Sequence, residues 1–237
     1  MSTSDIKRYT LSALLDADSF FYALIDPSNH KVHKKGKFIY TDMKDRLAIE
    51  TIDPASSKIS IWTDRMTIIP QEEYDESDIM RYLDVDEAET SLTMRSDFLG
   101  ESSAYVCYAI APSILAELSD HASESKIQHF ITSLSRSLLR MYSSVILLYR
   151  QEDKTLLLAV KDGKILSFST TQEVSPVSML YHVSLVTEKH SRMKDATIAL
   201  SGEFQEDDKT SRLMSKYFPT EVLGASFHLE SIYQCAS

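Results

Sequence analysis

Runs of apolar residues separated by short polar turns make up the first part of the chain. Runs that alternate, or that are rich in strand formers, predict strands, and one run of helical composition lies among them. In order, we expect three strands, a helix and a fourth strand, at residues 9–15, 19–25, 37–41, 43–52 and 58–62. Because the polar residues 16–18 connect the first two strands, we expect these strands to form a hairpin.

The second part of the chain repeats this order. Three strands, a helix, a strand and a second helix are expected at 144–149, 155–160, 164–169, 177–193, 197–200 and 207–217. Asp162-Gly163 is a hairpin signal before the third of these strands, and Ser175 followed by Pro176 is typical of a helix start. Two halves that share one order of elements suggest a structural duplication.

Further elements are expected between and after these halves. Strands at 90–95 and 105–111, a helix at 112–118 and a crossover within 126–139 connect the two halves. A helix at 72–83 is expected to continue into a solvated loop, and residues 72–89 carry nine carboxylates. Residues 226–233 alternate between apolar and polar side chains, which favours a strand that completes a sheet.

The element order predicts the fold class. Three antiparallel strands, a helix and a further strand form the order of the ribonuclease-H-like fold. Two such units in one chain make an α/β, actin-like ATPase fold with mixed sheets and an interdomain cleft, where a ligand is expected. We place the first unit at 1–125, including inserted strands and a helix, and the second at 126–237.

Four stretches of the sequence resemble a known family. They are Leu11–Asp26, Thr67–Pro70, His129-Phe130 and Leu200–Gly202. In their order and spacing, they resemble an uncharacterised bacterial family, a domain of unknown function with an actin-like ATPase fold. The resemblance extends over nearly the whole chain and implies a fold without an established activity.

The actin-like resemblance implies two phosphate turns, one in each half, of the pattern Asp-x-Gly. Glycine allows backbone N–H groups to approach the phosphates closely. In the first turn, Asp16 is present, but Asp18 replaces the glycine and Ser19 follows. The second turn has no glycine and contains Glu152 and Asp153. These acidic side chains would repel a nucleotide if they face the cleft.

The resemblance also implies a Gly-Gly turn that holds the nucleoside. Here Gly202 is present, but Glu203 replaces the second glycine. We therefore interpret all seven positions as lining a cleft whose nucleotide site has degenerated: Asp16, Asp18, Ser19, Glu152, Asp153, Gly202 and Glu203. A working site stays an alternative, because Asp16 could hold Mg²⁺ through water.

Other chemistry has little support in the sequence. The chain has five glycines and contains no Rossmann, Walker A or nucleophile-elbow motif. Residues 29–36, with His30 and His33 among lysines, are interpreted as a solvated basic loop that could contact an acidic partner. The acidic residues 72–89 fail the EF-hand pattern, and Cys107 is expected in the core. No cofactor and no metal are expected.

The remaining histidines are scattered, so no catalytic residue is assigned. They are His121, His129, His182, His190 and His228. A net charge of −10 disfavours nucleic acid, and no apolar run is long enough for a signal peptide or for membrane insertion. We expect a cytoplasmic protein.

Three functions stay open for a chain of this kind. The first is a non-catalytic scaffold that binds a cytoplasmic protein partner. The second is an ATPase or phosphotransferase, which the presence of Asp16 and Gly202 favours. The third is a small-molecule or cation sensor that uses the interdomain cleft, which Asp18, Glu152 and Asp153 favour. One fold hosts many functions, so the fold does not rank them.

Overall fold

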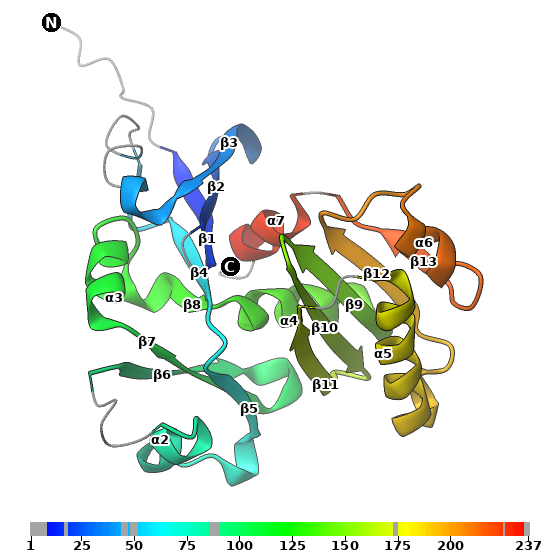
Figure 1. The fold of residues 1–237 in the computed structure, drawn as a ribbon. Coiled ribbons are helices and arrows are strands. Elements are labelled where there is room, and N and C mark those ends of the chain that lie inside the picture. The colour runs from blue at the N-terminus through cyan, green and yellow to red at the C-terminus, as the bar shows by residue number, and fades with distance from the viewer. Residues whose placement is uncertain are drawn as a thin grey trace, which may run out of the picture. The chain divides into compact units, whose positions relative to one another are not determined.

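Two compact units make up the chain, each with a five-stranded sheet (Figure 1). One unit contains Met1–Leu134 and Leu229–Ser237, and the other contains Ser135–His228. The computed structural model describes residues 9–16, 19–43, 47, 52–85, 91–172, 175–224 and 226–234. Asp18, Cys235 and most of the helix expected at 43–52 lie outside these residues.

The first unit has a mixed sheet in the order β3-β2-β1-β4-β8. Its strands are β1 (Thr10–Asp16), β2 (Ser19–Asp26), β3 (Lys31–Ile39), β4 (Lys58–Trp62) and β8 (Ile127–His129). The first three strands pair antiparallel, whereas β4 lies parallel to β1 and β8 lies parallel to β4. β1, β2 and β4 confirm the expected segments.

Side chains that alternate along β1 divide between the two faces of this sheet. Leu11, Ala13 and Leu15 belong to a hydrophobic core with residues of β2 and β4. On the other face, the Ser12 hydroxyl donates a hydrogen bond to the carbonyl of Leu229 in α7 (Phe227–Gln234), at 2.6 Å. The face that carries Ser12 is therefore covered in part by the last helix of the chain.

A small antiparallel sheet is inserted after β4 in the first unit. Its strands are β5 (Met66–Pro70), β6 (Thr93–Leu99) and β7 (Ala104–Ile110), in the order β5-β7-β6. The helix α2 (Ile79–Tyr82) packs on this sheet through Ile79, whereas α3 (Pro112–Ser119) contributes Leu118 to the core of the main sheet. Cys107 is fully buried in this insertion, and burial raises the pKa of its thiol to about 11. This confirms the expectation of a core cysteine.

The second unit repeats the order of the first. Its sheet runs β11-β10-β9-β12-β13, with β9 (Ser144–Gln151), β10 (Lys154–Lys161), β11 (Lys164–Thr171), β12 (Thr197–Gly202) and β13 (Thr220–Val222). One face packs on α5 (Pro176–Lys189) and α6 (Lys209–Met214), which contribute Met179, Val183 and Met214 to the core. As expected, Ser175 caps α5, because its hydroxyl accepts a hydrogen bond from the Ser178 N–H at 3.1 Å.

Three expectations were wrong. Residues 226–233 contain the helix α7 instead of a strand, because their buried side chains recur at the helical spacing of His228, Ser231 and Ile232. The basic stretch 29–36 falls largely in the edge strand β3, which begins at Lys31 and not at residue 37. The helix expected at 72–83 is reduced to two short 3₁₀ turns and α2.

Candidate functional site

The β9–β10 hairpin carries the second predicted phosphate turn. Gln151 pairs with Lys154, so Glu152 and Asp153 form the tip of the hairpin. Both acids are exposed, and Glu152 has a left-handed backbone with φ of 53°. The turn therefore has the conformation that favours glycine without having the glycine. The carboxylates of Glu152 and Asp153 place two negative charges at the tip.

Arg150, the residue before Gln151, joins this hairpin to the end of β12. Gly202 pairs with Arg150 in the parallel register of β12 and β9. The Glu203 N–H donates to the Arg150 carbonyl at 2.9 Å, and the Arg150 guanidinium donates to the Glu203 carbonyl at 3.0 Å. Its guanidinium carbon also lies 4.2 Å from the ring centre of Phe204. The hairpin turn after Arg150 and the turn after Gly202, which the resemblance assigns to a nucleotide, are therefore connected by hydrogen bonds between Arg150 and Glu203.

Asp208 extends this network to α6. Its carboxylate forms an ion pair with Arg150 at 3.3 Å and accepts a hydrogen bond from the Ser211 N–H at 2.7 Å. Asp208 is the N-cap of α6, where a carboxylate satisfies an open backbone donor. Arg150 and Asp208 therefore fix the start of α6 against the ends of β9 and β12.

Gln151 is a candidate site residue that sequence reasoning missed. It is 3% exposed, and its side-chain oxygen accepts a hydrogen bond from the Tyr149 hydroxyl. Among the described residues, its Nε2 has no hydrogen-bond partner, and neither does the buried hydroxyl of Ser201 on β12. Buried polar atoms of this kind are usually satisfied by protein groups or by ordered water. The only sequence signal was the alternation of β9, which places Gln151 on the face of Tyr149.

The first predicted phosphate turn lies in the other unit. Asp16 ends β1, is 6% exposed, and pairs in register with Ser19 of β2 and Trp62 of β4. Ser19 is partly buried. The structure therefore brings Asp16 and Ser19 together at one hairpin. In the second unit it brings Gly202 and Glu203 together with Arg150, two residues before Glu152.

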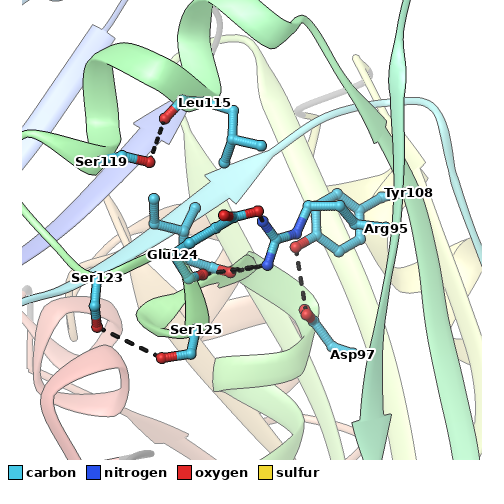
Figure 2. Close-up of polar contacts among 9 residues, drawn as sticks. Arg95, Asp97, Tyr108, Leu115, Ser119, Ser123, Glu124 and Ser125 are labelled. Carbon is cyan, nitrogen blue, oxygen red and sulfur yellow. Dashed lines mark hydrogen bonds and ion pairs between the residues drawn. The ribbon is translucent and has the colours of Figure 1, made fainter.

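A buried polar cluster in the first unit surrounds Asp97 of β6. Its carboxylate accepts hydrogen bonds from the His129 N–H at 2.6 Å, the Thr132 hydroxyl at 2.8 Å and the Tyr108 hydroxyl at 3.3 Å, the last shown in Figure 2. Desolvation raises the pKa of Asp97, while these hydrogen bonds oppose the shift. Asp97 thus attaches the inserted sheet to the start of α4 (Phe130–Met141).

His129 is the fully buried member of this cluster. Its Nδ1 accepts a hydrogen bond from the Ile131 N–H at 3.2 Å, which leaves Nε2 to donate to the Thr63 carbonyl at 3.3 Å. Burial lowers the pKa of His129 from 6.5 to about 4, so the ring is neutral near pH 7. These contacts give His129 a structural role.

Arg95 lies beside the same cluster and links β6 to the turn before β8. Its guanidinium donates to the Glu124 carboxylate at 2.9 Å and to the Glu124 carbonyl at 3.2 Å (Figure 2). The Arg95 side chain is largely buried, whereas that of Glu124 is largely exposed. The pair therefore supports the connection between the inserted sheet and the main sheet.

No metal site or membrane helix occurs in the part of the chain that the structure describes. Within those residues, no three His, Cys, Asp or Glu side chains are grouped so that they could hold a metal ion. In the same ranges, no helix is long and apolar enough to cross a membrane.

Comparisons with known proteins confirm the fold. A protein of unknown function with an actin-like ATPase fold from Bacteroides thetaiotaomicron is 14% identical, with a TM-score of 0.78 over 99% of both chains. A PilM-PilN type IV pilus biogenesis complex is 8% identical, with a TM-score of 0.55 over 94% of this chain and 90% of the other. An Arthrobacter inorganic polyphosphate/ATP-glucomannokinase is 9% identical, with a TM-score of 0.50 over 95% and 97%.

Sequence comparison adds a family to this fold. No curated protein sequence matches the chain. A family model does match, over residues 56–220, which is most of the chain, and it describes a protein of unknown function. The chain belongs to this family, DUF3822, and has an actin-like ATPase fold.

Proposed function

We propose that this chain is a non-catalytic interaction protein that uses an actin-like fold, with a degenerate nucleotide site, to bind a cytoplasmic protein partner. The observation that carries the proposal is the network around Arg150. Its guanidinium contacts the Glu203 carbonyl, the Asp208 carboxylate and the ring of Phe204. These contacts occupy the ends of β9 and β12 with protein groups, in a fold that otherwise uses such turns for phosphates.

Charge supports the same proposal. The hairpin tip beside Arg150 consists of Glu152 and Asp153, both exposed. Coulomb repulsion between these carboxylates and a polyphosphate opposes binding, and it increases where the dielectric is reduced. The turn is thus better suited to a cation or a protein surface than to a nucleotide.

The solved structures provide a precedent for each of two functions. The PilM-PilN structure is a complex of proteins in type IV pilus biogenesis, which supports an interaction role for this fold. The glucomannokinase uses polyphosphate or ATP, which supports the alternative of an ATPase or phosphotransferase. For this alternative, the favourable observation is Asp16, which is buried at the end of β1.

A small-molecule sensor is the third candidate, and one observation favours it. The buried Nε2 of Gln151 and hydroxyl of Ser201 lie on one face of the second sheet without partners among the described residues. A small polar ligand could satisfy both groups.

We expect millimolar Mg-ATP or Mg-ADP to leave the melting temperature unchanged to within about 1 °C. A ligand present at 100 times its Kd adds about 2.7 kcal/mol to the stability of the folded state. In a chain of this length, such a gain raises Tm by roughly 5 to 10 °C. Differential scanning fluorimetry measures the shift, with Mg²⁺ alone and ATP with EDTA as controls. A saturable rise of several degrees that requires both Mg²⁺ and nucleotide would favour the ATPase.

A further inference from the structure

The outermost strand of the first sheet, β3, concentrates positive charge on a chain with a net charge of −10. Residues 31–37 contain four lysines and one histidine, and no acidic residue. Every residue of this range is exposed. Among the described residues, no further strand pairs with the outer edge of β3. An edge strand presents alternate N–H and C=O groups outward and so offers a template for an added strand.

One face of β3 has an ordered pattern of side chains. The register with β2 places Val32, Lys35, Lys37 and Ile39 opposite residues 25, 23, 21 and 19, on the face away from the Leu24 core. Val32 is 44% exposed and Ile39 is 60% exposed. Along the strand, this face therefore presents an apolar residue, two lysines and a second apolar residue.

The irregular part of β3 limits where another strand can pair. The register with β2 shifts between Leu24 and Ile25, which corresponds to His33 on β3. The His33 ring stacks on Tyr9, with 4.4 Å between ring centres. A bulge of this kind disturbs the ladder locally. Residues 34–39 form the regular part of the edge.

Building on the proposed interaction role, we propose that β3 is a docking strand for an extended acidic segment of a partner protein. The segment pairs with the regular part of the edge, residues 34–39, so that two of its carboxylates face Lys35 and Lys37 and an apolar residue faces Ile39. A second apolar residue, beyond the regular part, lies near Val32. Opposite charges on facing strands stabilise the pair, and like charges oppose it. The lysines therefore oppose a basic strand and favour an acidic one. Nucleic acid is disfavoured, because it cannot pair with the edge backbone and the chain is acidic overall.

A synthetic peptide tests this docking strand directly. The probe is a fluorescent heptapeptide, Val-Thr-Glu-Thr-Glu-Thr-Val, whose odd positions reproduce the complementary pattern. We expect saturable binding by fluorescence anisotropy, and at least about tenfold weaker binding by the double variant Lys35→Glu with Lys37→Glu. The control variant Lys164→Glu with Lys189→Glu makes the same change of charge at exposed positions of the second unit and should bind as the wild type does. Equal binding by both double variants would overturn the proposal.

Two further probes separate strand pairing from charge attraction alone. A peptide that is N-methylated at alternate residues keeps its charges but cannot complete the ladder, so we expect it to lose binding. Undiminished binding of that peptide, or equally tight binding of single-stranded DNA of equal charge, would contradict strand addition.

Capture from the native lysate distinguishes this surface from the proposed function. Recovery of a stoichiometric partner by the wild type but not by Lys35→Glu with Lys37→Glu supports both. If both chains recover the partner, the docking strand is wrong and the interaction role stands. If neither chain recovers a partner, the interaction role itself fails.

Discussion

Replacing Gly202 with alanine should lower the free energy of unfolding by about 3 to 5 kcal/mol. Gly202 has a φ of 81°, and a Cβ at this position would lie 2.1 Å from the Arg150 carbonyl oxygen. A left-handed backbone costs alanine about 1 to 2 kcal/mol before any clash. The clash is with backbone, so relief requires moving β12 away from β9 and weakening the Glu203 N–H to Arg150 hydrogen bond. Urea unfolding measures the loss.

Gly224 provides the matched control for this substitution. It also lies in the second unit, and a Cβ added there would meet no atom within 4 Å. We expect Gly224→Ala to change the free energy of unfolding by less than about 1 kcal/mol. Equal stability of the two alanine variants would contradict the close packing of Gly202 against the Arg150 carbonyl.

Acidification should remove about 3 kcal/mol of stability through His129 alone. The folded state lowers the pKa of His129 from 6.5 to about 4, because the ring is buried. Between these two values the unfolded chain binds a proton and the folded chain does not, so stability falls as pH decreases through this window. His129→Gln, which has no titrating ring, should lose this part of the pH dependence. Urea unfolding at several pH values from 6.5 to 4 provides the comparison.

Two measurements distinguish loss of the titrating ring from a general loss of stability in the His129→Gln variant. His182→Gln on α5, where the ring is partly exposed, serves as the control and should keep the wild-type dependence. In the wild type, NMR titration should show a His129 ring that stays neutral until about pH 4. A ring that titrates near 6.5 would contradict the buried, neutral histidine.

Several elements could be predicted because local pattern and tertiary context agree. β1, β4 and β9 are largely buried and rich in strand-forming apolar residues, so their segments were visible in the sequence. α5 was visible from Ser175 and Pro176, which start it. β13, of three residues, was missed because so short a strand has no periodicity to detect.

The site was less predictable than the fold. Glu152 and Asp153 form an exposed hairpin tip, while Gln151 beside them is buried. That the two acids line a cleft stays a prediction. Which side of a strand end is buried depends on packing that a turn motif does not encode. The contact between Asp97 and His129 joins residues far apart in sequence, and a single sequence carries no signal for it.

Hydrogen exchange at the ends of β9 and β12 tests the central claim most directly, because we propose that a nucleotide site has degenerated there. Amide exchange is followed by mass spectrometry in the segments 149–154 and 200–204, with and without millimolar Mg-ATP. We predict identical exchange, because Arg150 already joins these segments through Glu203. Nucleotide-dependent protection in both segments would contradict the account and identify a working phosphate site.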